Sequence, residues 1–427
     1  MMIKKNLVFT IAILIALFMT AQSVYSTDGY RRHGFGSKYS SLGGSGVALS
    51  LSSLGSITNP AGLVFLDKNR FDINVSLFSP SRDYNVTGMP SGFPGTFGLT
   101  PGKIISETDY FAMPTMGVSY KVQDNMAIGL TIFGNGGMNT SYMTQTFHDP
   151  SSPLTGVNLE QLFAGATYSI EFVENHSLGV TGLFAWQRFR AAGLGSFAGF
   201  SSSPNNLTGN TNSISSGFGT KIGYMGRLLP QLSVGGSFQT KMYMSEFERY
   251  SGLFAQQGGF DIPATWTAGF AAMPAPGLTF SFDVTQILYS QIKSINNPMM
   301  PNLTQSTGML GMEDGAGFGW EDMTVYKFGL MYEGVPGWSF RGGYSYGKQP
   351  IPDSEVMFNI LAPGVIEQHI TLGLSKVVCN NEFSIGFMYA LNKEVSGPNS
   401  LEVPGQQTID LSMNQWQIDF GYAFSGF

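Results

Sequence analysis

Apolar and polar residues alternate along most of the chain after residue 70. In LTFSFDV (278–284), Leu, Phe, Phe and Val fall on one face, whereas Thr, Ser and Asp fall on the other. The segments WSFRGGYSYG (338–347) and WQIDFGYAF (416–424) repeat the pattern. Alternation with a period of two predicts β-strands whose two faces meet different surroundings.

Fourteen segments carry this pattern and are predicted to be strands: 69–80, 107–121, 125–140, 158–171, 176–192, 212–228, 231–245, 261–273, 277–291, 321–333, 337–347, 364–377, 381–394 and 409–424. Short connections alternate strictly with long ones. The short ones lie at 123–125, 173–176, 229–231, 274–277, 334–337 and 377–381. The long ones lie at about 81–106, 141–157, 193–211, 246–260, 292–320, 348–363 and 395–408.

An even number of strands, with short turns at one end and long loops at the other, is typical of outer-membrane barrels. A soluble β-sandwich gives no reason to sort its connections in this way. We therefore predict an all-β fold, a transmembrane antiparallel β-barrel of about 14 strands. Because the first connection is long, both chain ends should lie on the periplasmic side.

Composition agrees with a barrel rather than with membrane-spanning helices. Of the 427 residues, 43% are hydrophobic and only 12% are charged, yet no internal window offers the roughly 18 apolar residues in a row that a spanning helix needs. The net charge of −6, without Lys/Arg clusters, argues against a nucleic-acid partner. The single cysteine, Cys379, excludes an intramolecular disulfide and a Cys-based metal site.

The N-terminus is predicted to be a secretion signal, residues 1–26. Lys4 and Lys5 precede a short apolar stretch at 7–19, and small residues allow cleavage after Ser23 or Ser26. These features favour a protein of the bacterial outer membrane.

The two faces of the predicted strands differ in chemistry. The outward set is apolar, whereas the inward set is Gly, Ser, Thr and Gln with isolated charges at Asp283, Lys327, Arg341 and Asp419. A general porin would line its channel with more charge. The C-terminal Phe427 is out of phase with the outward face of the last strand, so either the chain kinks at Gly426 or its last residues hang free.

The third predicted strand contains an unusual glycine run, IFGNGGMN (132–139). Glycine inside a strand marks a bulge, a bend or the close approach of another backbone. A bend at Gly134, Asn135, Gly136 and Gly137 could open a lateral window in the barrel wall. Alternatively, the strand ends near Phe133 and the glycines begin the loop.

Signals for catalysis or metal binding are weak. GYSYG (343–347) matches the Gly-x-Ser-x-Gly nucleophile pattern, but Ser345 lies inside an alternating strand with no helix after it. The four histidines are far apart, and the acidic segment 312–322 could hold a cation or be a solvated loop. We expect no enzyme activity, no cofactor and no metal.

Several segments together resemble a known family, the outer-membrane transporters of long-chain fatty acids and aromatic hydrocarbons of the FadL/TodX type (OMPP1). The similar segments include GFGSKYSSLGGSGVALS…SITNPAGLVFL (34–66), FDINVSLFSPSRDYNVTG (71–88), FDIPATWTAGFA (260–271), LTFSFDVTQILYS (278–290), WEDMTVYKFGLMYE (320–333), WSFRGGYSYGKQPIPD (338–353) and EQHITLGLS (367–375). The resemblance implies an N-terminal plug, or hatch, at 27–68 inside a 14-stranded barrel at 69–427. It also implies that Asn59, Pro60 and Ala61 form the hatch motif, and that FGNGG (133–137) forms an inward kink through which ligand leaves.

Apolar segments of the long loops fit the capture of a hydrophobic ligand, or they fold inward as a lid over the hatch. The ligand-binding residues expected here are Phe93, Phe97, Leu99, Phe197, Phe200, Phe254, Met299 and Met300. Arg341 and Lys327 could pair with a ligand carboxylate; ion pairs with Asp283 or with hatch acids are the favoured alternative.

The function predicted from these features is passive outer-membrane transport of long-chain fatty acids or aromatic hydrocarbons, by loop capture, hatch gating and lateral exit. Its partners would be that small hydrophobic ligand, outer-membrane lipid and lipopolysaccharide, and the protein is expected to be a monomer. Two alternatives are a plugged structural or adhesin-like barrel that binds a partner through its loops, and an outer-membrane lipid hydrolase using Ser345.

Overall fold

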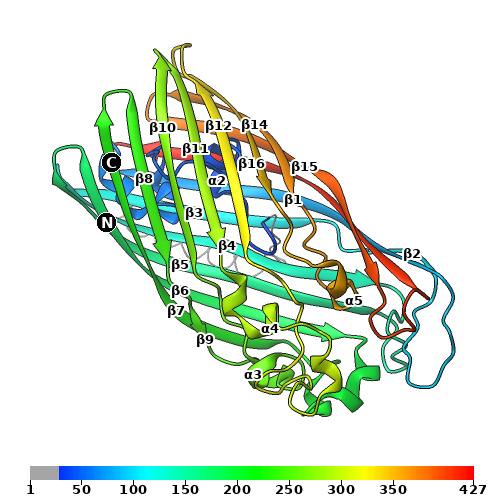
Figure 1. Cartoon of the computed structure of the whole chain (residues 1–427). Helices are drawn as coiled ribbons and strands as arrows, with labels where there is room; N and C mark the ends of the chain where they lie inside the picture. The colour runs from blue at the N-terminus through cyan, green and yellow to red at the C-terminus, as the bar shows by residue number, and fades with distance from the viewer. Residues whose placement is uncertain (1–27) are drawn as a thin grey trace, which may run out of the picture.

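The computed structural model describes residues 28–427, and the predicted signal peptide lies outside these residues. One antiparallel sheet contains every strand of this part of the chain, and β1 (Arg70–Thr87) pairs with β16 (Thr408–Ser425) to close it into a barrel (Figure 1). The other wall strands are β3 (Phe111–Gln123), β4 (Met126–Tyr142), β5 (Thr155–Val173), β6 (His176–Ala192), β7 (Ser213–Leu229), β8 (Leu232–Gln239), β10 (Thr265–Ala275), β11 (Leu278–Ile287), β12 (Met323–Tyr332), β13 (Trp338–Gly347), β14 (Gln368–Val378) and β15 (Asn381–Pro398). Two short strands, β2 (Gly102–Ile105) and β9 (Tyr243–Met244), only extend β1 and β7 at the loop end, so the wall has 14 strands, as predicted.

Each predicted strand is present, with shifts at the ends. The first strand continues to Thr87, seven residues beyond its predicted end at 80, because β16 pairs with it along its whole length. The segment 231–245 is interrupted after Gln239 and resumes only as β9. The segment 277–291 ends at Ile287, since residues 289–291 form a short helix.

The long connections contain short helices at one end of the barrel (Figure 1). These are η3 (Gly195–Phe200), η4 (Pro204–Asn206), η5 (Glu248–Tyr250), α3 (Ala255–Gly258), η6 (Tyr289–Gln291), α4 (Lys293–Asn296), η7 (Asn302–Thr304), η8 (Asp353–Glu355) and α5 (Val356–Asn359). In the part of the chain described by the structure, we find no helix with the length and apolar character needed to cross a membrane.

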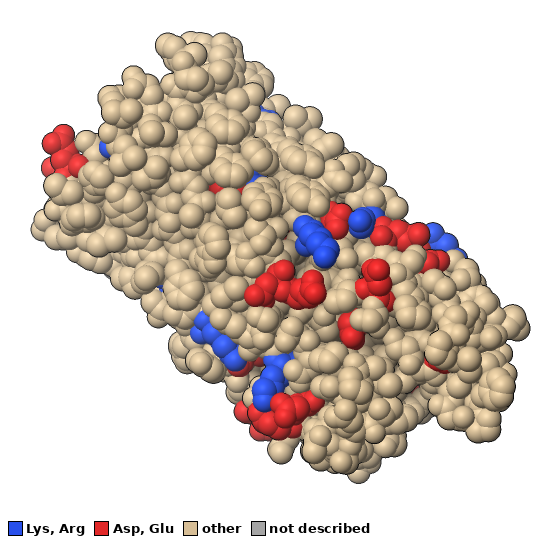
Figure 2. All heavy atoms as spheres, in the orientation of Figure 1, with Lys and Arg blue, Asp and Glu red and all other residues tan. Residues whose placement is uncertain are grey.

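Alternation sorts side chains between the interior and the outside of the wall. In β11, Thr279, Ser281 and Asp283 are buried, whereas the apolar residues between them are partly exposed. Many large apolar side chains are exposed on the outward face, among them Leu372 at 61% and Phe420 at 56%. On the face shown in Figure 2, the wall is nearly free of charged atoms, and most of them gather toward the loop end.

The chain end follows the kink alternative. Gly426 has a φ of +82°, a conformation that glycine adopts without steric cost. This turn brings the Phe427 ring parallel to that of Phe424, with the ring centroids 6.1 Å apart.

Residues 28–66, which we call the plug, lie inside the barrel and contain α2 (Gly36–Ser40), η1 (Ser53–Ile57) and η2 (Pro60–Phe65). The wall binds the plug from several sides. Asp283 of β11 accepts hydrogen bonds from the backbone N–H groups of Gly46 and Val47, at 2.7 and 2.9 Å. Gly43 donates its N–H to Thr371 of β14 at 2.9 Å. The inward polar residues predicted from the alternation therefore bind the plug, and they do not line an open channel at this level.

Candidate functional site

The glycine run forms a bend in β4. The β3–β4 ladder extends only as far as the pair Thr115 and Phe133, and beyond this pair β4 remains bonded to β5 alone. The β4–β5 register shifts between Gly134 and Gly136, so Asn135 is the extra residue of a bulge. The strand itself continues to Tyr142, which fits the predicted bend and not an early end at Phe133.

In place of β3, the bent part of β4 pairs with the start of the plug. Arg31 forms an isolated antiparallel bridge with Gly136. The N–H of Arg32 donates to the Asn135 carbonyl at 2.8 Å, and the N–H of Gly137 donates to the Tyr30 carbonyl at 3.0 Å. A Cβ atom at position 136 would lie 1.8 Å from the Tyr30 carbonyl oxygen, so only glycine permits this approach.

Nearer the loops, β4 is again hydrogen-bonded to the segment that precedes β3. There, the N–H of Glu107 donates to the Ser141 carbonyl at 2.9 Å. Between this junction and Phe133, the backbones of β3 and β4 are not paired, and the Arg82 guanidinium bridges β4 and the segment before β3 by donating to the carbonyls of Asn139 and Thr108. A lateral break in the β-ladder is thus spanned by one side chain.

A large apolar cluster fills the loop end of the barrel, and we call it the outer apolar cluster. It includes or contacts six of the eight predicted loop residues: Leu99, Phe197, Phe254 and Met299 are buried members, and Phe97 and Met300 pack against it. The Phe197 ring lies 5.2 Å from Phe97 and 5.4 Å from Phe358. Phe93 and Phe200, in contrast, are exposed at 65% and 37%.

A small cavity of about 40 Å³ lies within the outer apolar cluster. Its walls are apolar and come from β5, β6 and the loops: Phe189, Phe197, Phe254, Phe318, Phe358 and Leu361 are among them. Phe189, Phe318 and Phe358 were not predicted from the sequence as ligand-binding residues. Phe189 follows the inward phase of β6, which could have indicated its position, whereas nothing local distinguishes Phe318 or Phe358.

An aromatic group connects this cluster with the bend in β4. The Tyr30 ring lies 5.4 Å from Tyr289, which in turn lies 5.2 Å from Trp320. The Tyr289 hydroxyl donates to the Asp28 carbonyl at 2.6 Å. A second cavity, of about 30 Å³, lies between Tyr30, Arg82, Met138 and Trp320. The first residues of the plug therefore contact both the outer apolar cluster and the break in the wall.

The Asn-Pro-Ala segment anchors the other end of the plug. Asn59 caps η2, since its side-chain oxygen accepts from the Ala61 N–H at 3.0 Å, and Pro60 occupies the first helical position. The Asn59 amide donates to the carbonyls of Val47 at 2.7 Å and Tyr224 at 2.9 Å. The Ala61 carbonyl accepts from the hydroxyls of Ser169 and Ser177. One turn thus joins two plug segments to β5, β6 and β7.

Three of the four inward charges, Asp283, Lys327 and Asp419, bind the plug, whereas Arg341 binds a neighbouring wall strand. Lys327 lies 3.0 Å from the Asp28 carboxylate and donates to the His33 carbonyl at 2.8 Å. This is the predicted alternative of an ion pair with a plug acid. Arg341 donates to the Ser375 hydroxyl at 2.7 Å, and Asp419 pairs with Arg32 of the plug at 3.3 Å.

Ser345 hydrogen bonds to His369 at 2.9 Å, and the His369 ring stacks on His33 of the plug with centroids 5.1 Å apart. All three are buried where the plug meets the wall, and Ser345 lies within β13, without the strand-to-helix turn that exposes a nucleophile. Among residues 28–427, no group of three or more His, Cys, Asp or Glu could hold a metal ion.

A closed 14-stranded barrel with an N-terminal plug, an apolar exterior and long loops at one end defines the protein as a plugged barrel of the outer-membrane type. Solved structures share the fold, among them the following three. The toluene transporter TodX of Pseudomonas putida matches with a TM-score of 0.66 and 16% identity, over 92% of this chain and 99% of that chain. The toluene transporter TbuX of Ralstonia pickettii gives 0.63 and 16% over 92% and 99%. A Pseudomonas aeruginosa FadL homologue gives 0.67 and 15% over 95% and 99%.

The chain therefore has the fold of the FadL/TodX-type transporters, as its sequence segments predicted. No protein-family model and no curated protein sequence matches the chain.

Proposed function

We propose that the protein is a passive outer-membrane channel for small hydrophobic molecules, either fatty acids or aromatic hydrocarbons, and not an enzyme. The observation that carries the proposal is the bend of β4, which leaves β3 and binds the start of the plug beside the outer apolar cluster. A structural barrel would have no use for this interruption of its ladder. The transporter fold shared with TodX, TbuX and the FadL homologue supports the same function.

The route begins at the loops. Phe93 and Phe200 are exposed and would capture ligand from outside, whereas Phe97, Leu99, Phe197, Phe254, Met299 and Met300 would receive it in the outer apolar cluster. Each CH₂ group gains about 0.8 kcal/mol on leaving water. A hydrophobic ligand would therefore remain on an apolar path and would be retarded by a water-filled pore.

Gating follows from the contacts of the plug. Residues 30–32 would detach from Gly136 and Gly137 while Asn59, Pro60 and Ala61 keep the rest of the plug fixed to the wall. Ligand would then leave sideways through the break beside Gly134 and Asn135, into the membrane. In this proposal residues 1–26 are the signal, 27–68 the hatch and 69–427 the barrel, with both ends periplasmic and the protein a monomer. Lys327 is held by Asp28, which leaves Arg341 as the better candidate to meet a ligand carboxylate.

Uptake of radiolabelled oleate and of toluene by cells that produce the protein tests the function. Faster uptake of at least one ligand than in cells with the empty vector is expected. If neither ligand enters faster, the channel function is wrong and a structural or adhesin-like barrel becomes the better explanation.

A separate variant tests the lateral exit. In Gly136→Val, the side chain meets the Tyr30 carbonyl, so the bend cannot keep its contact with the plug. We expect uptake to fall by roughly tenfold, equivalent to about 1.4 kcal/mol of barrier. Gly182→Val is the matched control, because a Cβ atom there meets nothing within 4 Å. Equal uptake by the two folded variants would exclude exit at this bend.

A further inference from the structure

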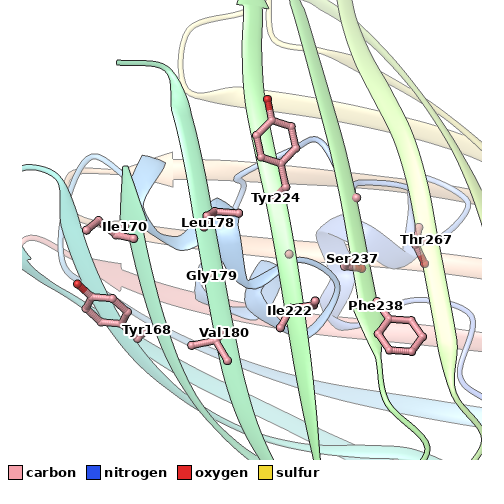
Figure 3. Close-up of a pocket in the computed structure, with 12 residues that line it drawn as sticks. Tyr168, Ile170, Leu178, Gly179, Val180, Ile222, Tyr224, Ser237, Phe238 and Thr267 are labelled. Atoms are coloured by element: carbon pink, nitrogen blue, oxygen red, sulfur yellow. The ribbon is translucent and has the colours of Figure 1, made fainter. Parts of the chain in front are cut away.

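A hollow of about 600 Å³ lies on the outward face of the wall, across β5, β6, β7, β8 and β10 (Figure 3). Its rim consists of Tyr168, Leu178, Val180, Ile222 and Phe238, all exposed by between 39% and 53%. The hollow lies outside the barrel and is separate from the route of the proposed function. Its volume falls within the range of about 300–1,000 Å³ that is common for ligand pockets.

The lining of the hollow contains no charged side chain. Its apolar side chains belong to the same outward set that continues along the strands, for example in Leu372 and Phe420 elsewhere on the wall. The hollow is therefore continuous with the surface that would meet the hydrocarbon of the membrane, and this step rests on the proposed membrane location.

A missing side chain on the outward face contributes to the hollow. Gly236 faces outward in β8, at a position where its strand neighbour Phe238 carries a ring. Next to it, Gly179 of β6 pairs with Gly223 of β7, which pairs with Ser237 of β8. A Cβ atom at Gly236 would have the Thr267 carbonyl oxygen, 3.8 Å away, as its nearest neighbour, so there is room for a side chain that the sequence does not supply.

The strand backbone that forms the floor of the hollow contacts the plug on its inner side. A Cβ atom at Gly179 would lie 2.4 Å from the Pro60 carbonyl carbon, and one at Gly223 would lie 2.1 Å from the Asn59 side-chain oxygen. In Figure 3 the blue ribbon of the plug runs directly behind these strands. A single layer of glycine backbone thus separates the hollow from the Asn-Pro-Ala turn.

The hollow lies near the end of the barrel with short turns. Its β5 and β6 residues flank the turn at 174–175, since β5 ends at Val173 and β6 begins at His176. In the proposed orientation this end faces the periplasm, so the hollow would meet the inner leaflet of the outer membrane, which consists of phospholipid.

We propose that this hollow is a binding site for the acyl chain of a membrane phospholipid. An empty space against a packed wall forfeits the dispersion contacts of its lining, and a flexible hydrocarbon chain from the adjacent leaflet fills it without desolvating any charged group. Because lipid and groove are equally apolar, fit rather than water exclusion selects the occupant. The bound chain rests on the backbone that holds Asn59 and Pro60.

The test uses the full protein in nanodiscs that contain phosphatidylethanolamine with a photoreactive diazirine in one acyl chain. After irradiation, peptides are mapped by mass spectrometry over a series of probe fractions. The proposal predicts labelling of 168–180 and 222–238 that saturates at low probe fraction, whereas the rest of the outward face is labelled in proportion to probe.

Gly236→Leu fills the hollow and should abolish the saturable labelling, and Ile222→Trp is a second filling variant. Gly182→Leu is the matched control, since Gly182 is exposed on β6, outside the hollow, with open space around it. Heat-dependent electrophoretic mobility shows that each variant has formed a barrel. Even, unsaturable labelling, or saturable labelling that Gly236→Leu leaves unchanged, overturns the proposal.

Competition separates this proposal from the channel function. If free oleate or toluene removes the saturable labelling and unlabelled phosphatidylethanolamine does not, the site belongs to the transported ligand and the phospholipid assignment is wrong. Labelling is measured without transport, so a channel that fails the uptake test can still pass this one if it inserts into the nanodisc.

Discussion

Individual inward side chains of this barrel are matched to the plug they surround. Asp283 accepts two backbone N–H groups, Lys327 pairs with Asp28, and Asp419 pairs with Arg32. All of these side chains are buried. A buried charge that loses its partner is strongly destabilising, whereas exposed pairs contribute little. These inward charges therefore determine where the plug is held.

Replacing Lys327 by methionine should loosen the start of the plug, because the Asp28 carboxylate stays buried without its cation. We expect a loss on the order of 3–5 kcal/mol in the local free energy of opening, measured as faster hydrogen exchange of the backbone amides at 28–34. Adding Asp28→Asn should recover much of it.

Lys103→Met provides the control for this prediction, because Lys103 forms an ion pair with Asp83 while 56% exposed. Its effect should be below about 1 kcal/mol. Equal exchange at 28–34 in Lys327→Met and Lys103→Met would mean that the Asp28 pair does not hold the plug.

The loops and strands show how sequence-distant elements are joined. η8 reaches across to the loop before β12, where the Glu355 carboxylate accepts from the Met299 N–H at 2.8 Å. Met299 belongs to the outer apolar cluster, and Glu355 is itself buried. This contact links two long loops above the proposed ligand route.

Acid pH should stabilise the loops around Glu355. Burial raises the pKa of Glu355, although hydrogen bonds from Met299 and Ser354 act in the opposite direction. A carboxyl whose pKa is raised by folding stabilises the folded loops when it is protonated, and this stabilisation is lost as pH rises through the raised pKa. Hydrogen exchange of residues 293–304, corrected for the intrinsic rate, should therefore be slower at pH 4 than at pH 7.

Glu355→Gln removes the titrating group while keeping an oxygen acceptor for the Met299 N–H. Its corrected exchange at 293–304 should be independent of pH over this range. Glu321→Gln is the control, because Glu321 is exposed and lies in the loop that contains residues 293–304, and it should behave like the parent. A Glu355→Gln variant with the parental pH dependence would contradict the assignment.

The barrel and its plug form one closed assembly. The plug contacts strands around the circumference, through Asp419 in β16, Thr371 in β14, Asp283 in β11 and Tyr224 in β7. The outer apolar cluster covers the interior at the loop end. Ions that enter the barrel would therefore meet packed side chains at the level of the outer apolar cluster and again at the level of the plug.

Deleting residues 28–66 while keeping the signal should convert the barrel into an ion-conducting pore. In planar bilayers we expect little steady conductance from the parent protein and a steady conductance from the deletion variant, because the inward face left behind is polar. Heat-dependent mobility would verify that the variant closes. A closed variant with parental conductance would show that the loops alone seal the barrel.

Much of the barrel could be predicted from local pattern. Alternation in segments such as LTFSFDV assigns each residue to one face, since successive side chains of a strand point in opposite directions. The strand number, the turn lengths and the inward position of Asp283 and Lys327 follow from this period. That Asn59 caps a short helix was not predicted, although Asn and Pro favour the first positions of a helix.

The contacts of the plug could not be predicted from the local pattern of the sequence. Three kinds of contact join residues far apart in sequence. They are the bridge between Arg31 and Gly136, the Tyr30–Tyr289–Trp320 group, and the hydrogen bond from the Met299 N–H to Glu355. No local period encodes such pairs, because they depend on how deep the plug sits and how the loops fold over it. The glycine run at 134–137 illustrates the difference. Its composition allowed a bend or a loop, and the backbone of Tyr30 against Gly136 made it a bend.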